Sequence, residues 1–250
     1  MKNPSQKEQI LWNQIKIADA GFLINLDERT DRLNDSLIEL EKINLSGVQR
    51  FSAIKILQDT EKGHIVRSCT HSHLELMKLQ IKNGWDKMLV LEDDFYFEIC
   101  CGTQYSFTDD DINNISNTEF DLLFLGLRLK EKTSFVNSFL IKPGLLNQTH
   151  AYLISLGFSK FVVNNFNYLD KDSMVCGEQI DTYFSVLASK KHWKMEREYK
   201  DKELILNNNF KIYCYYPVLF NQRPSFSNIT NKKEAFNSIN YKFNLENYPS

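Results

Sequence analysis

Three consecutive carboxylates, Glu92, Asp93 and Asp94, directly follow the apolar run at residues 88–91. A short unbroken apolar run is typical of a strand buried on both faces, as in a mostly parallel sheet covered by helices. We expect the acids at the C-terminal end of this strand, where open α/β sheets bind ligands. Crowded carboxylates repel one another, and Mg²⁺ or Mn²⁺ relieves the repulsion. The run therefore indicates a metal–phosphate site, with a solvated acidic turn as the alternative.

A second acidic run, Asp109, Asp110 and Asp111, follows Thr108. Threonine followed by acids is a start signal for a helix, because carboxylates are favourable at the positive end of the helix dipole. We therefore interpret this run as a solvated helix cap and not as a metal site.

The elements that position these residues alternate between strands and helices. Strands are predicted at residues 20–26, 48–54, 121–126, 149–155 and 210–216, and helices at 30–43, 63–83, 157–168 and 178–189. Thr30 is expected to cap the first of these helices, with Leu33, Leu37 and Leu40 on its buried face. A further short helix is predicted at residues 6–17. The pattern favours one α/β domain over residues 1–250, in which residues 190–250 form a less regular extension.

Composition excludes several classes of protein. The chain has 250 residues, 42% of them hydrophobic, and a formal net charge of -2, so nothing attracts it globally to nucleic acid or anionic membrane. Its five cysteines have neither disulfide-framework nor zinc-finger spacing. The N-terminus is too polar for a signal peptide, and no apolar run approaches the ~20 residues that span a bilayer. We therefore expect a cytoplasmic protein, for which membrane-peripheral attachment and a viral origin are further options.

Four stretches together resemble glycosyltransferase family 25, which includes lipooligosaccharide and collagen galactosyltransferases. Residues 24–32 (INLDERTDR) are similar to the family's I-N-L-D-x-R-x-D-R opening, and residues 63–74 (GHIVRSCTHSHL) to its G-x-x-G-C-x-x-S-H block. Residues 89–94 (LVLEDD) match its acidic strand end, and residues 149–155 (THAYLIS) its later strand. The order and spacing of the four motifs make the resemblance specific over about residues 20–185.

Two positions depart from the family pattern. Ser68 stands where a glycine is usual, and Asn228 replaces an expected aspartate in a closing block near the C-terminus. We assign no chemistry to Asn228.

The resemblance implies a GT-A fold, a Rossmann-like mixed sheet flanked by helices that binds a UDP-sugar. It also implies an inverting transfer of a hexose, with galactose or glucose favoured. Mn²⁺ or Mg²⁺ would neutralise the diphosphate leaving group. Glu92 and Asp94 give an E-x-D spacing similar to the D-x-D of such folds, with Asp93 as a substitute because the chain leaves strand geometry here. His150 is a further candidate ligand for the metal or acceptor, with a polar residue at the strand end as the equal alternative.

The resemblance also suggests roles for the other polar candidates. Asp181 is the candidate general base, and Glu178, one helical turn earlier, is its rival. The alternative for both is the solvated face of an amphipathic helix.

The nucleotide site is expected to include the charged segment after the first strand, with Asp27, Arg29 and Arg32. Its alternative is a local pair between Glu28 and Arg32. Ser72 and His73 are expected near the sugar-diphosphate, whereas Cys69 is interpreted as a packed small residue.

Two other functions stay open on the sequence. A Mg²⁺-dependent phosphoryl-transfer or receiver domain also places acids at the end of a buried strand, although no G-x-x-x-x-G-K-[ST] motif occurs here. A non-catalytic relative would keep the fold as a nucleotide-sugar-binding module. The donor sugar, the acceptor (glycan, lipooligosaccharide or protein hydroxyl) and the oligomeric state are not encoded in any recognisable pattern.

Overall fold

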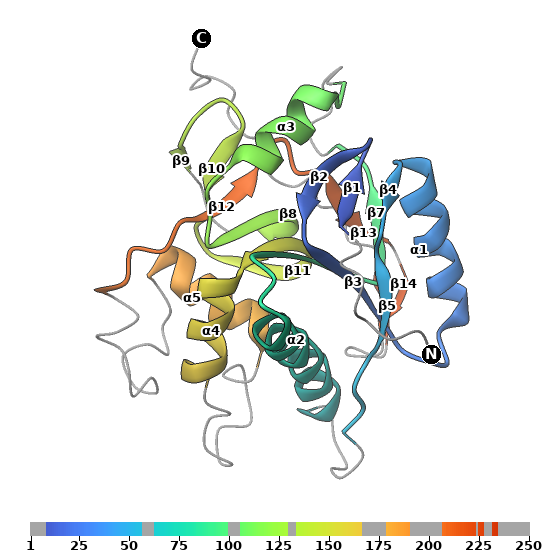
Figure 1. Ribbon diagram of the computed structural model, residues 1–250. Coiled ribbons are helices and arrows are strands. Elements are labelled where there is room, and N and C mark those ends of the chain that lie inside the picture. Colours follow the sequence, from blue (N-terminus) through green and yellow to red (C-terminus); the bar gives the residue numbers. More distant parts are fainter. Residues whose placement is uncertain are drawn as a thin grey trace.

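The computed structural model describes residues 9–56, 63–99, 106–129, 134–166, 179–190, 207–223, 225–227 and 232–234. A large twisted sheet crosses the middle of the molecule, with helices on both faces (Figure 1). The predicted class, an α/β protein with a mixed sheet flanked by helices, is confirmed.

The central sheet has eight strands in the order β5-β3-β6-β11-β8-β12-β10-β9. The strands β5, β3 and β6 are parallel, β11 runs antiparallel to both β6 and β8, and β12 is parallel to β8. Their bounds are Gln49–Ser52 (β5), Ala20–Asn25 (β3), Lys87–Glu92 (β6), Leu146–Ser155 (β11), Leu122–Leu129 (β8), Ile212–Tyr215 (β12), Leu140–Lys142 (β10) and Ser134–Phe135 (β9).

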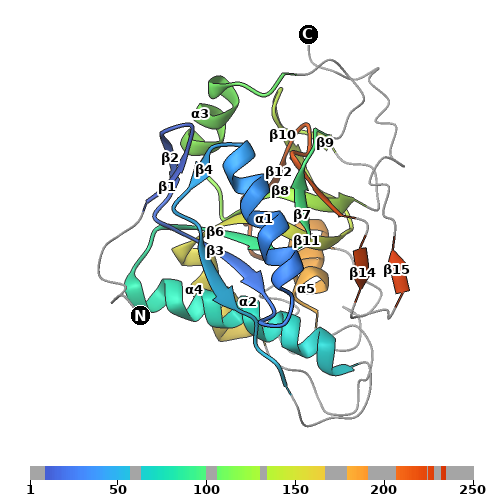
Figure 2. The same cartoon turned by 90° about the vertical axis from the view of Figure 1, so that its right-hand side faces the viewer.

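The helices divide between the two faces of this sheet. On one face lie α2 (Gly63–Asn83), α4 (Leu156–Asn165) and α5 (Ile180–Ser189); on the other lie α1 (Thr30–Lys42) and α3 (Asp109–Asn117) (Figures 1 and 2). Shorter strands complete the fold: β1 (Ile10–Trp12), β2 (Ile15–Ala18), β4 (Leu45–Ser46), β7 (Phe95–Phe97), β13 (Phe220–Gln222), β14 (Ser225–Ser227) and β15 (Lys232–Glu234).

The buried strand β6 shows why both faces need cover. Successive side chains of a strand point to opposite faces. Met88 and Val90 therefore pack in the core under α2, α4 and α5, whereas Leu89 and Leu91 pack in the core under α1 and α3. All four side chains are fully buried. A strand of this kind needs a continuous apolar run, which is the pattern that predicted it.

The order of the strands places a topological switch point beside β6. The chain runs from β3 through α1 to β5 on one side, and then through α2 to β6 on the other side of β3. Helix α1 begins after β3 and helix α2 after β5, and the two helices lie on opposite faces, so the loops after β3 and β5 diverge. A crevice at the carboxyl ends of such strands is where open α/β sheets bind ligands.

The predicted helix at residues 6–17 is wrong over the part that the structure describes. Residues 10–18 form the antiparallel hairpin of β1 and β2, which turns at Asn13 and Gln14. Both turn residues have positive φ, at 45° and 68°, a conformation that a helix does not contain. Ile10, Trp12 and Ile17 are buried on one side of the hairpin, so the apolar spacing that suggested a helix belongs to two strands.

Helix α1 differs from the prediction in two details. Its N-cap is Arg29 and not Thr30, and no side-chain hydrogen bond caps the helix. Leu40 is buried as expected, but Leu37 is half exposed and the small Ser36 is buried instead. The buried face of α1 is thus rotated toward Ser36, next to the end of β6.

The predicted extension at residues 190–250 is partly built into the sheet, since β12 lies between β8 and β10. The single-domain assignment stays a prediction. Among the described residues, no helix is long and apolar enough to cross a membrane.

Candidate active site

A cavity of about 160 Å³ opens at the switch point, at the carboxyl ends of β3, β5 and β6. One side is apolar and consists of Ile24, Leu26, Ala53 and Ile54. The other side carries the acidic strand end together with polar residues of α1, α2 and β13. One water occupies about 30 Å³ of liquid, so the cavity admits an ion with its waters or part of a larger ligand. Apolar walls with a few convergent polar groups are typical of small-molecule sites.

The three acids at the end of β6 separate toward different helices. Glu92 continues the alternation of Met88 and Val90 and lies next to His73 of α2. Asp93 continues the alternation of Leu89 and Leu91 and lies next to Arg32 of α1. The period of the strand therefore gives adjacent carboxylates different partners.

Asp93 is held on all sides by the protein. Its Oδ1 accepts a hydrogen bond from Arg32 Nη1 at 2.9 Å, and its Oδ2 accepts one from Asn25 Nδ2 at 2.8 Å. Ser36 Oγ donates to the Asp93 carbonyl at 3.0 Å. Burial and the charge of Asp94 raise the pKa of Asp93, and Arg32 opposes that rise. These contacts favour a positioning role for Asp93, because both its oxygens are engaged.

Asp94 is engaged at one oxygen only. Its Oδ2 accepts a hydrogen bond from Gln222 Nε2 at 2.8 Å and lies 3.4 Å from Arg32 Nη1. Its Oδ1 is buried and has no hydrogen-bond partner among the described residues. Arg223 N donates to the carbonyl of Asp94 at 2.7 Å. A buried carboxylate oxygen without a donor is costly unless a ligand supplies the missing contact.

Glu92 lies on the α2 side of the cavity. Its Oε1 is 3.3 Å from Nε2 of the fully buried His73, whose Nδ1 is 2.8 Å from the hydroxyl of Tyr152. Burial raises the pKa of Glu92; the neighbouring His73 lowers it, and the charge of Asp94 adds to the rise. Burial likewise raises the pKa of the nearby Cys69 thiol, with the charge of Glu92 as the next cause.

Ser72 has a structural task at the rim of the cavity. Its hydroxyl accepts a hydrogen bond from Ile54 N at 2.9 Å and donates to the carbonyl of Ser68 at 2.9 Å. Ser68 Oγ in turn accepts from Ile56 N at 3.0 Å. These bonds fasten the segment after β5 to α2. Ser68, where the family pattern has glycine, therefore contributes a contact that glycine cannot make.

The charged segment after β3 is brought only partly to the cavity. Arg32 lines it, but Asp27 and Arg29 are not among its lining residues. Asp27 accepts hydrogen bonds from Ser52 Oγ at 2.6 Å and from Arg50. Arg29 makes two hydrogen bonds to Asp31, at 2.9 and 2.8 Å.

The local alternative for this segment, a pair between Glu28 and Arg32, does not form. Glu28 pairs with Lys55, and Arg32 pairs with Asp93. The Arg32 guanidinium therefore pairs with an acid of the cavity and not with a residue next to its own helix.

His150 and Asp181 lie beyond the cavity lining. His150 is buried on β11, with Nε2 2.9 Å from the carbonyl of Phe220. Asp181, in the first turn of α5, accepts hydrogen bonds from Gln148 N at 3.2 Å and Thr182 N at 2.7 Å. Its charge contributes to the raised pKa of Cys69, after burial and the charge of Glu92. Glu178 lies outside the described residues.

Sequence reasoning missed three residues that organise the site. Asn25 binds Asp93 and accepts from Arg50 Nε at 2.9 Å, Tyr152 supports His73, and Gln222 supports Asp94. Asn25 stands inside the first family-like stretch, so its place beside Asp27 was a usable signal. Tyr152 also lies in a family-like stretch, the fourth, but no local pattern indicates that it would contact His73 or that Gln222 would contact Asp94, since each reaches its partner from a distant strand.

Comparison with known proteins adds little to this geometry. No family model and no curated protein matches the sequence. Among solved structures, A197 from STIV is 10% identical, with 78% of this chain and 80% of that chain covered at a TM-score of 0.39. A glycosyltransferase involved in the glycosylation of the major capsid of PBCV-1 is 12% identical, with 81% and 92% covered at a TM-score of 0.40.

A nucleoside-diphosphate-sugar pyrophosphorylase from Vibrio cholerae RC9 is 11% identical, with 75% and 81% covered at a TM-score of 0.35. Similarity at this level carries no argument about function. The function is therefore inferred from the residues and geometry of this chain.

Proposed function

We propose that this chain is a metal-dependent inverting glycosyltransferase that moves a hexose from a UDP-sugar to a hydroxyl of a glycan or protein. Galactose and glucose are the favoured donor sugars. The observation that carries the proposal is the cavity at the switch point, where Glu92, Asp94 and Arg32 meet at the carboxyl ends of parallel strands. The resemblance of four sequence stretches to family 25 and its GT-A fold supports the same reaction.

The cavity has surfaces suited to both parts of a nucleotide diphosphate. Ile24, Leu26 and Ala53 offer an apolar wall for a base or ribose. Arg32 lies on the polar side, where a guanidinium can donate paired hydrogen bonds to phosphate oxygens. Asp27 and Arg29 would have to act from the rim, because neither lines the cavity.

The residues present fit a hard divalent cation. Asp94 has a buried Oδ1 without a partner among the described residues, and the Glu92 side chain is 24% exposed. Mn²⁺ and Mg²⁺ favour carboxylate oxygens, so Asp94 and Glu92 would hold such an ion. His150 remains a proposed ligand from outside the cavity lining. The ion would supply Lewis acidity and neutralise the charge of the diphosphate leaving group.

Inversion requires a base on the side of the sugar opposite the leaving group. Asp181 is the proposed base and takes the proton of the acceptor hydroxyl. Each of its oxygens accepts one backbone hydrogen bond, and a carboxylate oxygen has a further lone pair for that proton.

The first test measures UDP release from a panel of UDP-sugars with Mn²⁺, Mg²⁺ or EDTA. Wild type is compared with Asp94→Ala and with Asp110→Ala, a matched removal of an exposed aspartate. We expect turnover with one sugar, lost in EDTA, lowered by about 10²–10³-fold in Asp94→Ala and unchanged in Asp110→Ala.

Other outcomes support the alternatives. Metal-dependent UDP-sugar binding without turnover on any acceptor points to the non-catalytic binding module. Absence of both binding and turnover removes the glycosyltransferase proposal and leaves a phosphoryl-transfer or receiver domain, which phosphate-analogue binding then tests.

A further inference from the structure

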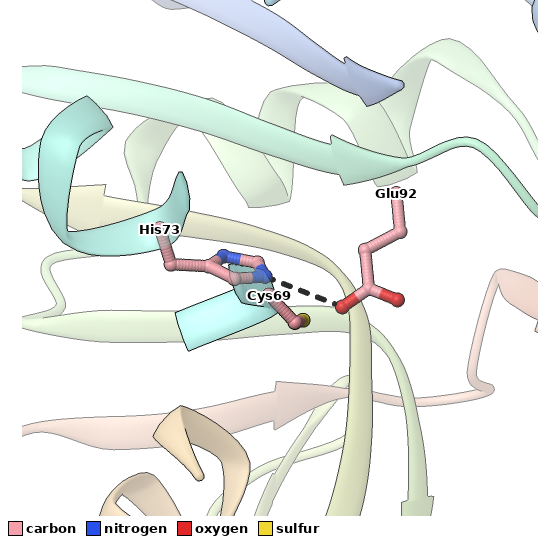
Figure 3. Close-up of side chains that lie close together, drawn as sticks. All are labelled: Cys69, His73 and Glu92. Atoms are coloured by element: carbon pink, nitrogen blue, oxygen red, sulfur yellow. Dashed lines mark ion pairs between the residues drawn. The ribbon is translucent and has the colours of Figure 1, made fainter. Parts of the chain in front are cut away.

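Three ligating side chains of different chemistry converge on the α2 side of the cavity. Cys69 and His73 are one helical turn apart on α2, and Glu92 is the last residue of β6 (Figure 3). Their sulfur, nitrogen and carboxylate atoms all lie within 4.8 Å of one another. Residues four apart share a helix face, so α2 presents its two ligands together.

We propose that Cys69, His73 and Glu92 form a zinc site that binds its ion without any nucleotide. This inference goes beyond the proposed function, which concerns a hard cation held with Asp94 and a diphosphate.

The spacing of the His73 and Glu92 ligand atoms fits a tetrahedral ion, and the Cys69 sulfur lies within 4.8 Å of both atoms. Zinc bonds to histidine nitrogen and carboxylate oxygen are about 2.0–2.2 Å long, which separates two tetrahedral ligands by roughly 3.3–3.5 Å. His73 Nε2 and Glu92 Oε1 are 3.3 Å apart. That contact lacks hydrogen-bond alignment, and Nε2 has no hydrogen-bond partner among the described residues. Because His73 is fully buried, its unpartnered nitrogen is costly unless a ligand occupies the site.

Tyr152 supports the histidine in the way that zinc sites require. A metal-binding imidazole usually hydrogen-bonds through its other nitrogen, which fixes the ring orientation. His73 Nδ1 lies 2.8 Å from the Tyr152 hydroxyl, and the two rings are stacked with centroids 5.8 Å apart. Nε2 is thereby directed toward Cys69 and Glu92, as Figure 3 shows.

The ligand set selects the kind of metal. A thiolate favours zinc over magnesium or manganese, whereas all-oxygen sites favour the latter two. Binding converts the Cys69 thiol to thiolate, and its proton leaves to solvent. The thiolate and the Glu92 carboxylate together then balance the double positive charge of the ion. Three protein ligands leave the fourth position for water or a ligand, and all three residues line the cavity, which gives the ion an entry path.

The zinc site and the proposed Mn²⁺ or Mg²⁺ site both use Glu92, and the two sites can share this residue. In Figure 3 one carboxylate oxygen of Glu92 faces His73, and the other points away from the ring. The test therefore measures zinc without nucleotide, so that its result is independent of sugar transfer.

The experiment uses the full chain with Cys100, Cys101 and Cys176, which lie outside the described residues, replaced by serine. Purified protein is stripped with chelator and titrated with Zn²⁺, and with Co²⁺ as a spectroscopic probe. We expect one Zn²⁺ per chain and a thiolate-to-cobalt charge-transfer band. Cys69→Ser and His73→Ala should lose the band and weaken Zn²⁺ binding by more than about 100-fold. Cys214→Ser, which alters a buried cysteine on β12, should change neither.

Circular dichroism verifies that each variant is folded. If Cys69→Ser does not fold, Tyr152→Phe keeps the test decisive, with an expected loss of about 10–100-fold in Zn²⁺ affinity. A band that persists in Cys69→Ser, or an unchanged affinity in Tyr152→Phe, overturns the zinc site. Zinc binding with no UDP-sugar turnover would contradict only the proposed function, and turnover without zinc binding would contradict only this inference.

Discussion

The chain contains two acidic triplets of similar composition and opposite surroundings. Glu92–Asp94 ends a buried strand, and Asp93 and Asp94 are each only 7% exposed. Asp109–Asp111 begins a helix, and Asp109 and Asp110 are exposed. The first triplet, the strand triplet, pairs with the cation of Arg32 and accepts hydrogen bonds from the neutral amides of Asn25 and Gln222. The second, the helix triplet, is compensated by the helix itself and by water.

Asp111 is the exception within the helix triplet. Its Oδ2 accepts hydrogen bonds from Thr108 N and Oγ1 at 2.8 and 2.9 Å, and its Oδ1 accepts one from the Tyr215 hydroxyl at 2.7 Å. Both carboxylate oxygens of Asp111 therefore accept hydrogen bonds from the protein. In the strand triplet, Asp94 Oδ1 has none among the described residues. The difference indicates that one triplet completes the fold, whereas the other is arranged for a ligand.

Removal of Arg32 should have the largest effect on stability. Arg32→Ala leaves Asp93 and Asp94 buried with their shared cation gone, and breaking a buried pair costs about 3–5 kcal/mol. Arg29→Ala removes a cation whose partner, Asp31, is exposed, and should cost about 0–1 kcal/mol. Urea denaturation measures both. Equal losses in the two variants would contradict the dependence of the strand triplet on its buried cation.

Asp111→Ala should be the next largest change. It removes a helix cap and leaves the buried Tyr215 hydroxyl without its acceptor, so we expect a loss of about 2 kcal/mol. UDP and metal binding should be unaffected. Asp110→Ala, at the exposed neighbour, should change stability by less than about 0.5 kcal/mol. An Asp111→Ala variant that retained wild-type stability would show that the helix does not need this cap.

Glu92→Gln should stabilise the metal-free protein. Burial raises the pKa of Glu92, so the folded state binds a proton more readily than the unfolded state. Stability then falls as the pH rises above the ordinary value of 4.5 toward the raised folded pKa. At pH 8 in EDTA we expect a gain in stability, measured by urea denaturation, which disappears near pH 4.

Glu119→Gln is the control for the direction of this stability change. Lys211 donates a hydrogen bond to Glu119 and lowers its pKa, so ionised Glu119 contributes stability above its ordinary pKa. Its replacement should therefore act in the opposite direction at pH 8. Denaturation curves of both variants are measured from pH 4 to pH 8. If both substitutions changed stability in the same direction at pH 8, the raised pKa of Glu92 would be refuted.

The smallest effect is expected at Asp31, an exposed acid paired with one arginine. Hydrogen bonds from Arg29 lower the pKa of Asp31 from 3.8 to about 2. The pair therefore contributes above pH 3.8 and its contribution disappears as the pH falls to about 2. NMR titration of the Asp31 carboxyl should give this midpoint, and Arg29→Ala should return it toward its ordinary value with little change in stability.

The sequence predicted the strand triplet and its place because its signal is local. Four apolar residues followed by acids leave few other arrangements, and the structure has the strand from Lys87 to Glu92. The hairpin of β1 and β2 was missed because its spacing of apolar residues also fits a helix. Its turn at Asn13 and Gln14 lacks the glycine that usually marks such turns.

The partners within the site could not be predicted, because they are non-local. The local rule suggested Glu28 for Arg32, but Arg32 reaches Asp93, 61 residues away. Tyr152 reaches His73 across 79 residues. Such contacts depend on strand order and register, which the sequence pattern does not specify. The roles of Asp181 and His150 remain predictions for the same reason.

The hydrogen bond from Gln222 to Asp94 has a consequence for folding during synthesis. The two residues are 128 positions apart, and translation adds about 5–20 residues each second. For roughly 6–26 s the nascent chain therefore contains Asp94 without Gln222. Until β13 is synthesised, Asp94 Oδ2 lacks the hydrogen bond that Gln222 donates in the folded protein. Synthesis order thus makes the completed cavity one of the last parts of the molecule to mature.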